Sequence, residues 1–287
     1  MKEKIQQLRH LFGIDVDCIN VKMCAFVGRS LHQTSIPSGD DFSQKDLIDA
    51  ISKYYNSFNY PFDGIGIAFS GCTSNGLEVS STSLKCLEGL NVHSFKHLDC
   101  ENIRFINDAN ATTLAGTIEY PDSKVLIGVT NGTGIGCGIA INGKLFTGAN
   151  GLAGEIYGNP TIGPDGNIIK NGKISSGSKL LKKLNQSNEI EKEKIIEQAA
   201  QYLGIEIVSL IHSYNPDVIY LSGGGFAFPS YKEILIDFIN KYTYPAFLKG
   251  LKIVQSTEPS YAGCFGAMKY VRWQNFPERI LSILSGE

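Results

Sequence analysis

No stretch of the sequence approaches the roughly 18–20 consecutive apolar residues that a membrane-spanning helix requires. Residues 1–10 are polar and charged, and they lack the apolar core of a signal peptide. The formal net charge is only -2 and we find no basic block, whereas binding to a phosphate backbone needs clustered Lys and Arg. These absences predict a cytoplasmic protein whose partners include neither a membrane nor nucleic acid.

Paired cysteines are missing as well. The seven cysteines are odd in number and scattered, and no two of them form a C-x-x-C motif. They are Cys18, Cys24, Cys72, Cys86, Cys100, Cys137 and Cys264. This pattern argues against a disulfide framework and against a zinc site made of cysteines. We expect most of them to be buried thiols in a reducing compartment.

The sequence does contain enough apolar material for two cores. Of its 287 residues, 43% are hydrophobic and 19% charged, and this length suits two lobes of about 100–150 residues each. Strand patterns alternate with helical periodicity, which is typical of an α/β protein. A strand–turn–strand pattern at 11–27 recurs at 124–141, which indicates two copies of one lobe plan. We predict an N-terminal lobe over residues 1–120, joined by a C-terminal helix at 272–287, and a C-terminal lobe over residues 121–271.

Several segments have clear local signals. Apolar residues fall on one helical face in Ser43–Tyr55, with Ser43 as the N-cap, and over the longer stretch Ser187–Ser213. Further helices are predicted at Ala262–Val271 and Phe276–Leu284. By contrast, residues 158–178 are rich in Gly, Pro, Asn and Ser, so we predict a loop or a small insertion there.

The sharpest motif is NGTGIGCG, at Asn131–Gly138, with glycine at every second position. A turn so depleted of side chains lets backbone N–H groups approach an anion closely, and Thr133 adds a hydroxyl. The motif therefore favours a phosphate loop. The alternative is a glycine-rich hairpin against which another part of the backbone packs.

A second candidate lies at the junction of a predicted strand and helix, where Asn107 precedes Asp108. Such junctions face the ligand crevice of α/β sheets. A carboxylate there can accept the proton of a substrate hydroxyl as that hydroxyl attacks phosphorus. The alternative is an ordinary helix N-cap, because Asp and Asn are common capping residues.

Two further stretches place small residues around a functional group. Glu155 follows the run Gly148–Gly154 and could accept hydrogen bonds from sugar hydroxyls, although a lone Glu on a turn is usually a solvated acid. Gly223–Gly225 follows a buried strand, so a flat base or a phosphate could lie against its backbone. An ordinary strand-to-helix turn explains the triple glycine equally well.

In this order, the motifs resemble those of the ROK family of sugar kinases and sugar-responsive repressors, and the resemblance covers most of the chain. Members of that family carry ND-x-N-A, G-T-G-x-G-x-G and G-A-x-G-x-A-G-E stretches, a triple glycine after an apolar strand, and a late A-G-x-x-G-A. The matching segments are Asn107–Ala111, Gly132–Gly138, Gly148–Glu155, Val218–Gly225 and Ala262–Ala267.

The resemblance implies an α/β fold of the actin-like ATPase (ribonuclease H-like) type, with two lobes and a ligand cleft between them. It also implies ATP and Mg²⁺, with Asp108 as the catalytic base. Asn107 and Glu155 match sugar-hydroxyl ligands, and Ser70-Gly71 matches a loop against the sugar. Asp15 matches a residue that contacts the nucleotide phosphates through Mg²⁺. Gly132, Thr133 and Gly134 match the second phosphate loop, and Gly224 and Gly225 match the region near the adenosine.

The sequence departs from the family pattern in three places. The family opens with D-x-G-G-T, but here Asp15 is followed by Val16-Asp17-Cys18-Ile19, which puts the first phosphate loop in doubt. The family's G-E-x-G-H ends here in Tyr157-Gly158, without the histidine. Its cysteine cluster is missing from residues 159–175. We therefore expect no structural zinc.

The resulting expectation is an ATP-dependent kinase that phosphorylates a hexose or N-acetylhexosamine hydroxyl, O6 by preference, and that forms a homodimer through its C-terminal lobe. No helix-turn-helix precedes the first strand, so we expect a kinase rather than a repressor. The alternative is a kinase-dead sugar sensor on the same fold, suggested by the altered first loop. A kinase for a non-sugar acceptor is a third option. The sequence does not identify the sugar.

Overall fold

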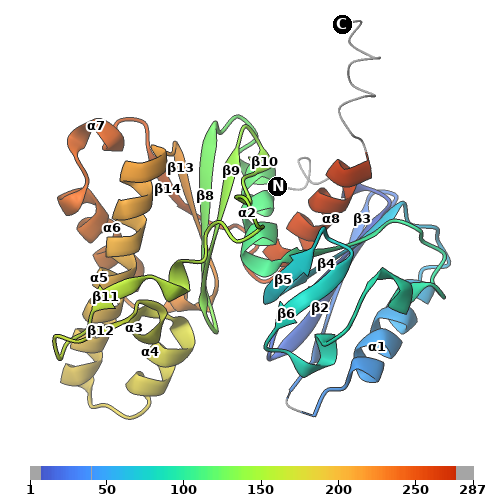
Figure 1. Cartoon of the computed structure of the whole chain (residues 1–287), viewed down its shortest axis with the longest axis horizontal. Helices are drawn as coiled ribbons and strands as arrows, with labels where there is room; N and C mark the ends of the chain where they lie inside the picture. The colour runs from blue at the N-terminus through green and yellow to red at the C-terminus, as the bar shows by residue number, and fades with distance from the viewer. Residues whose placement is uncertain (1–7, 40, 276–287) are drawn as a thin grey trace, which may run out of the picture. The chain divides into compact units, whose positions relative to one another are not determined.

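The computed structural model describes residues 8–39 and 41–275, which fall into two compact units. The first unit comprises the chain up to Glu119 together with the chain from Ser260, and the second comprises Tyr120–Pro259. Figure 1 labels their helices and strands. Each unit has its own mixed sheet and its own core.

Over its described residues, the first unit contains one five-stranded sheet, a small hairpin and three α-helices. Its strands are β1 (Leu11–Val16), β2 (Asn20–Val27), β3 (Ser30–Pro37), β4 (Gly64–Phe69), β5 (Gly71–Ser74), β6 (Glu78–Thr82) and β7 (Ile103–Asn107). Its helices are α1 (Gln44–Asn56), α2 (Asp108–Glu119) and α8 (Ala262–Asn275), with the short 3-10 helices η2 (Lys85–Leu87) and η3 (Val92–Phe95).

The second unit follows the same plan with more helices. Its strands are β8 (Val125–Asn131), β9 (Ile135–Ile141), β10 (Lys144–Leu145), β11 (Pro160–Ile162), β12 (Ile168–Lys170), β13 (Val218–Ser222) and β14 (Lys252–Gln255). Its α-helices are α3 (Gly172–Ser175), α4 (Gly177–Leu184), α5 (Glu189–Tyr214), α6 (Tyr231–Tyr242) and α7 (Pro245–Leu248), with the 3-10 helices η4 (Ile156–Gly158) and η5 (Gly224–Ala227).

The two five-stranded sheets have the same order, which confirms the predicted repeat. The orders are β3-β2-β1-β4-β7 and β10-β9-β8-β13-β14. In each sheet the first three strands in sequence pair antiparallel, and the remaining pairs are parallel. The parallel strands β1, β4 and β7 consequently end at one edge of the first sheet.

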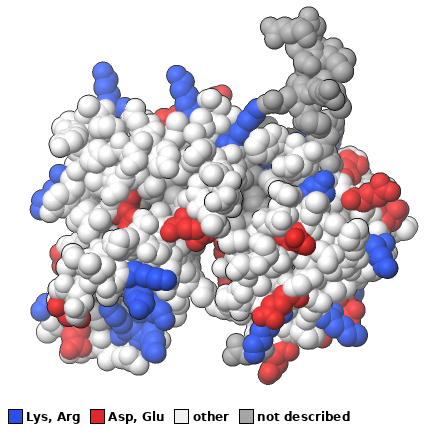
Figure 2. Space-filling view, in the orientation of Figure 1, with Lys and Arg blue, Asp and Glu red and all other residues white. Residues whose placement is uncertain are grey.

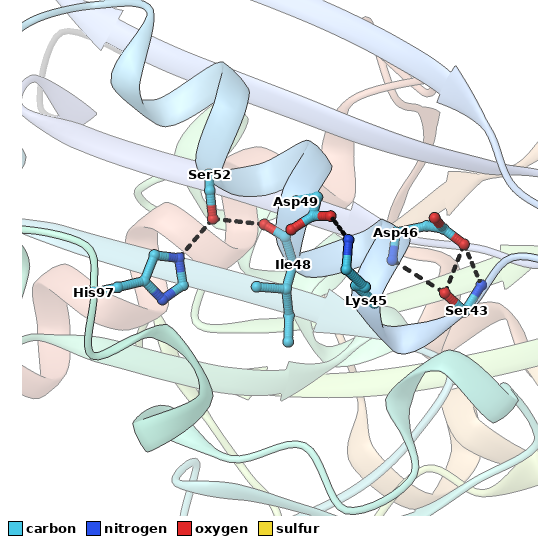
Figure 3. A network of polar contacts seen from close by, with 7 residues as sticks. All are labelled: Ser43, Lys45, Asp46, Ile48, Asp49, Ser52 and His97. Carbon is cyan, nitrogen blue, oxygen red and sulfur yellow. Dashed lines mark hydrogen bonds and ion pairs between the residues drawn. The ribbon is translucent and has the colours of Figure 1, made fainter.

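Helix α1 shows why its sequence forms a helix and how it is held (Figure 3). The Ser43 hydroxyl accepts a hydrogen bond from the Asp46 amide and the Asp46 carboxylate accepts one from the Ser43 amide, so the predicted N-cap is part of a capping box. Ser52 Oγ donates to the Ile48 carbonyl oxygen at 2.6 Å and lies 2.7 Å from His97 Nε2, which ties the helix to the segment after η3. Leu47 and Ile51, on the buried face, join the core.

Helix α8 belongs to the first unit, so the predicted C-terminal lobe at 121–271 was wrong over its last residues. The cause is close backbone packing. A Cβ added at Gly266 would lie 1.6 Å from the Ala111 carbonyl oxygen of α2, and one added at Gly66 of β4 would lie 2.2 Å from the Ala267 carbonyl oxygen. Of the predicted helix at 272–287, residues 272–275 form the end of α8 and the rest lies outside the described residues, as does the predicted helix Phe276–Leu284.

The segment predicted as a loop, 158–178, is more ordered than its composition suggested. It contains the β11–β12 hairpin, α3 and the start of α4. Composition misled us because polar side chains of this segment bond to groups far away in the sequence. Asn171 Nδ2, for example, donates to the Tyr202 carbonyl oxygen of α5 at 2.8 Å.

Across the part of the chain that the structure describes, no helix is long and apolar enough to cross a membrane.

Replacing Gly266 by alanine is expected to lower the Tm, because the new methyl group would force α2 and α8 apart. Overpacking costs about 1–3 kcal/mol, and a contact with backbone leaves little room to relax. The cost should exceed the roughly 1 kcal/mol that alanine gains over glycine in a helix. Gly39→Ala is the matched control, because a Cβ there meets nothing within 4 Å. Equal Tm values for the two variants in circular dichroism melts would contradict this packing.

Candidate functional site

The carboxyl edge of the first sheet gathers five of the predicted site residues. In the parallel register, Val16 lies opposite Phe69 and Phe69 opposite Asn107. Asp15 is therefore near the end of β1, Ser70 and Gly71 follow β4, and Asn107 and Asp108 join β7 to α2. Strand ends of this kind are where α/β sheets bind ligands.

Asn107 is the N-cap of α2, which was the alternative interpretation of the Asn107-Asp108 pair. Its Oδ1 accepts hydrogen bonds from the amides of Ala109 at 3.0 Å and Asn110 at 3.1 Å. Its Nδ2 donates to the Gly71 carbonyl oxygen at 3.1 Å, which fastens the loop after β4. Because Asn107 supplies these bonds, Asp108 is not needed as the N-cap. The half-buried Asp108 begins α2, and its Oδ1 also accepts a hydrogen bond from the Ala109 amide, at 2.8 Å.

The carboxyl group of Asp15, at this edge, is strongly perturbed. Its side chain is 15% exposed, and its pKa is raised to about 7, chiefly by burial. Lys22, whose Nζ lies 4.0 Å from Asp15 Oδ2, opposes this rise, while the charges of Asp108 and Asp17 add to it. Burial outweighs the single lysine, so the structure places a carboxylate where a further positive charge would be stabilising.

Two partners of Asp15 escaped sequence analysis. Lys22 lies directly across the β1–β2 hairpin from Asp15, and the predicted strand–turn–strand pattern could have identified this pair. Gly263, at the start of α8, is the other: a Cβ there would lie 2.6 Å from the Asp15 carboxylate. The glycine of the late A-G-x-x-G-A motif thus makes room for the acid.

The altered turn after β1 is closed by its own acid. Asp17 Oδ1 accepts a hydrogen bond from the Cys18 amide at 2.6 Å, and the Asp17 amide donates to the Asn20 carbonyl oxygen at 3.0 Å. Ser38 Oγ donates to the Asp17 carbonyl oxygen at 2.8 Å, while Ile19 is 63% exposed. The Cys18 amide therefore donates its hydrogen bond to the Asp17 carboxylate and is not available to a bound anion.

In the second unit, the tip of the β8–β9 hairpin is the turn Gly132–Gly134. The Gly132 amide donates to the Gly134 carbonyl oxygen at 2.9 Å, and Thr133 is exposed. Ser178 of α4 holds the turn from outside, since its amide donates to the Gly132 carbonyl oxygen at 3.0 Å and its hydroxyl to the Thr133 carbonyl oxygen at 2.5 Å. Sequence analysis missed Ser178.

Asn131 connects this turn to the triple glycine. It is fully buried, and its Oδ1 accepts from the Gly177 amide at 2.6 Å, while its Nδ2 donates to Tyr231 Oη at 3.0 Å. Gly223 and Gly225 both pack on Asn131, where added Cβ atoms would lie 2.4 Å from its carbonyl oxygen and 2.6 Å from its Cγ. The structure thus brings Gly224 and Gly225 together with Gly132–Gly134, as expected of one binding region.

Glu155 lies apart from that region. It is exposed at the start of η4, near enough to Cys137 of β9 for its charge to help raise the pKa of that thiol, after burial and Glu206. Gly154 allows this approach, because a Cβ there would lie 2.2 Å from the Cys137 carbonyl oxygen. Among the residues with described positions, no bond joins Glu155 to the turn Gly132–Gly134.

Hydrogen bonds fasten the loop in which the family's zinc ligands are missing. Asn159 Nδ2 donates to Glu206 Oε2 of α5 at 2.7 Å, and burial raises the pKa of Glu206, opposed by hydrogen bonds from Asn159 and Asn171. Within residues 8–39 and 41–275, no group of three or more His, Cys, Asp and Glu side chains could hold a metal ion.

The raised pKa of Asp15 predicts a specific pH dependence. Folded Asp15 holds its proton up to about pH 7, whereas an unfolded Asp loses it near pH 4. The stability contributed by the protonated acid is therefore lost as the pH rises from about 4 to about 7. In metal-free buffer, the Tm should fall less over this range in Asp15→Asn than in wild type, whereas Asp99→Asn, at an exposed site, should behave like wild type. Identical Tm profiles for wild type and Asp15→Asn would refute the assignment.

Comparison with known proteins agrees with these motifs. The sequence profile of the ROK family matches residues 11–173. The chain is 27% identical over 321 aligned positions to a xylose repressor from Caldicellulosiruptor bescii, covering 93% of this chain and 80% of the repressor. It is 33% identical over 131 positions to an N-acetylmannosamine kinase from Haemophilus influenzae, and this match spans 43% of each protein, less than half of the kinase.

Solved structures show the fold. A ROK hexokinase from Thermus thermophilus has a TM-score of 0.73 at 19% identity, covering 93% of this chain and 99% of the hexokinase. A ROK family glucokinase from Streptomyces griseus, solved with glucose and AMPPNP, has a TM-score of 0.69 at 17% identity, covering 91% and 99%. Both match the two-sheet α/β plan of this chain, which is that of the actin-like ATPases. Because the family profile also covers more than half of the sequence, the chain belongs to the ROK family.

Proposed function

We propose that the protein is an ATP-dependent kinase that transfers the γ-phosphoryl group to a hydroxyl, O6 by preference, of a hexose or N-acetylhexosamine. The observation that carries the proposal is the arrangement at the carboxyl edge of the first sheet. Asn107 caps α2 and leaves the Asp108 carboxylate half-buried beside Asp15. A half-buried carboxylate at a strand end is suited to accept a hydroxyl proton.

Each group of site residues has its own part in this proposal. Asp108 takes the proton of the attacking sugar hydroxyl, and Asn107 and Glu155 bind other sugar hydroxyls. Ser70 and Gly71 line the sugar from a loop that Asn107 and Thr82 hold in place. The exposed Thr133, with Gly132 and Gly134, binds phosphate, and Gly224 and Gly225 lie against the adenosine.

The residues present fit Mg²⁺, because the desolvated Asp15 carboxylate gains from a divalent cation and Mg²⁺ prefers oxygen ligands. When bound, Mg²⁺ would supply positive charge to offset the charge that develops on the phosphoryl oxygens. Lys22 would then keep the carboxylate oriented.

The proposal also includes a cytoplasmic location and a homodimer that forms through the second unit. Tyr242 and Tyr244 are exposed apolar surface on that unit, at 51% and 71%.

A sugar-binding sensor without kinase activity is the second candidate. The specific observation in its favour is the turn at Asp17–Ile19, where the Asp17 carboxylate occupies the Cys18 amide and adds negative charge beside Asp15. A triphosphate would be repelled there. Repressors occur among the relatives, as the xylose repressor illustrates, so family membership is compatible with both functions.

Asp108→Asn is expected to lower kcat by about 10²–10⁴-fold, because the amide cannot accept the hydroxyl proton. Sugar binding should survive, since the amide keeps the shape and the remaining polar contacts. The measurement is coupled ADP release at saturating sugar and ATP, with sugar affinity from calorimetry. Asp99→Asn serves as the control at an exposed acid in the same unit. Near-normal turnover in Asp108→Asn would exclude Asp108 as the base.

The two candidate functions differ in their response to nucleotide. A kinase should be stabilised by its sugar, gain a further Tm shift from Mg-ATP and release ADP. A sensor should be stabilised by sugar alone, because the Asp17 turn excludes the triphosphate. Thermal-shift measurements with a panel of hexoses and N-acetylhexosamines, each with and without Mg-ATP, distinguish the two. A sugar-dependent shift with neither an ATP shift nor ADP release would overturn the kinase.

A further inference from the structure

Helix α5 buries an acid that lies in none of the motifs recognised in the sequence. Glu206 is 6% exposed, and its neighbours on the buried face of the helix are apolar, among them Leu203, Ile207 and Leu210. Taking a carboxylate out of water costs free energy unless hydrogen bonds or an opposite charge compensate for it. The groups that compensate Glu206 therefore indicate the role of this acid.

No positive charge compensates Glu206 within the described residues. It takes part in none of the ion pairs there, and burial raises its pKa. Figure 2 shows Lys and Arg side chains gathered over the region where Figure 1 places α3 and α4. Five lysines lie at 170–183, a basic group that our sequence analysis missed, and all are exposed except the half-buried Lys183. Because these lysines lie at the surface, the buried carboxylate depends on hydrogen bonds.

Two asparagines supply those hydrogen bonds. Asn159 Nδ2 donates to Glu206 Oε2 at 2.7 Å, and the Asn171 side chain donates a second bond to the carboxylate. The two asparagines flank the β11–β12 hairpin, and the Asn171 amide donates to the Asn159 carbonyl oxygen at 2.9 Å. One buried carboxylate thus ties both ends of this hairpin to α5.

Glu155 lies between two fixed points of the second unit. On one side, Gly154 packs on β9, where an added Cβ would lie 2.2 Å from the Cys137 carbonyl oxygen. On the other side, Asn159 is the C-cap of η4. Only the residues of η4 separate Glu155 from Asn159. The direction of the Glu155 side chain therefore depends on where Glu206 holds Asn159.

The other asparagine has additional partners, which also hold the phosphate side of the unit. Asn171 Nδ2 donates to the Tyr202 carbonyl oxygen, and Asn171 Oδ1 accepts a hydrogen bond from Ser175 Oγ. The Ser175 carbonyl oxygen accepts in turn from Asn131 Nδ2 at 3.3 Å, directly before the turn Gly132–Gly134. These bonds fasten α3 and the turn without help from the buried acid.

Asn159 depends on the acid more strongly. Among the described residues, the Asn159 side chain bonds only to Glu206. The Tyr157 ring packs on Gly172, where an added Cβ would lie 1.9 Å from Tyr157 Cδ2, and Ile156 is buried. These apolar contacts keep η4 near its place, but they are not directional. Loss of the Glu206 carboxylate should therefore leave the fold intact and free the orientation of the loop.

We propose that Glu206 is a positioning residue for sugar binding: by holding Asn159, it keeps Glu155 in the orientation in which that side chain binds a sugar hydroxyl. The inference rests on the proposed function in taking Glu155 as a sugar ligand. It goes beyond that function because it separates the two ligands. Without the Glu206 carboxylate, the protein should bind its sugar less tightly, while binding of the nucleotide is unaffected.

The test reverses the direction of one hydrogen bond. Glu206→Gln keeps the shape of the side chain, but its amide nitrogen opposes one of the two asparagine donors. Adding Asn159→Asp restores both bonds, because the new carboxylate accepts from the new amide, whose oxygen still accepts from Asn171. Glu193→Gln is the matched control, at an exposed acid of the same helix. The KM values for sugar and ATP, kcat and Tm are measured for each protein, with sugar affinity from calorimetry.

In Glu206→Gln, the sugar KM and Kd should rise about tenfold, the effect expected from losing one hydrogen bond to a charged group. The ATP KM and kcat should change little, since Glu206 touches neither the phosphate turn nor the reacting atoms. The double variant should recover most of the sugar affinity, which would show that the two side chains act through each other. The control should match wild type.

Three results would contradict the inference while leaving the kinase intact. They are an unchanged sugar KM in Glu206→Gln, an equal rise in the KM values for sugar and ATP, and a double variant that binds sugar no better than Glu206→Gln. If wild type binds a sugar without releasing ADP, the proposed kinase activity fails, and the calorimetric affinities still decide on Glu206. If wild type binds no hexose or N-acetylhexosamine, both proposals fail.

Discussion

The structure depends on one steric constraint, the close contact of α8 with the first sheet and with α2. Backbone atoms meet where side chains would normally stand, at Gly13, Gly66 and Gly266. This contact returns the chain to the first unit after the second is complete. It also brings Gly263, at the N-terminal end of α8, against the Asp15 carboxylate. The glycines that determine the packing of the helix therefore also determine where the perturbed acid lies.

That acid explains the electrostatics of the edge where β1, β4 and β7 end. Burial disfavours the charge on Asp15, the neighbouring Asp108 and Asp17 disfavour it further, and Lys22 compensates only in part. A site that leaves a carboxylate short of positive charge is arranged for a cation or for a proton.

Much of this fold was predictable because its signals are local. The capping box at Ser43 and the long periodic helix α5 are specified by neighbouring residues, and the repeated strand–turn–strand pattern predicts two similar sheets. Residues 158–178 were harder, because the bonds that order them reach distant groups such as Glu206 and Tyr202. The membership of α8 depends on glycines that fit a surface more than 150 positions earlier, as Gly266 fits Ala111, and one sequence without its structure does not reveal that.

The residues of the candidate site also fall into two groups, those that the sequence predicts and those that only the structure reveals. Asp108, Asn107 and the glycines lie in motifs that can be recognised by eye, and strand order then places them. Lys22 and Ser178 lie in no motif, because their importance comes only from register and from packing. Asn131 stood at the edge of a recognised motif, yet its role as a buried connection between two glycine turns depends on Tyr231, 100 positions away.

The return of α8 to the first unit has a consequence for biosynthesis. Tyr120–Pro259 is a continuous insertion whose strands and helices are all available once residue 259 has left the ribosome. The first unit still lacks the helix that covers Gly13 and Gly66 at that moment, so one face of its sheet stays open. Domains generally fold as units during synthesis, and long-range contacts form slowly. The first unit can therefore be completed only after the whole of the second unit has been synthesised.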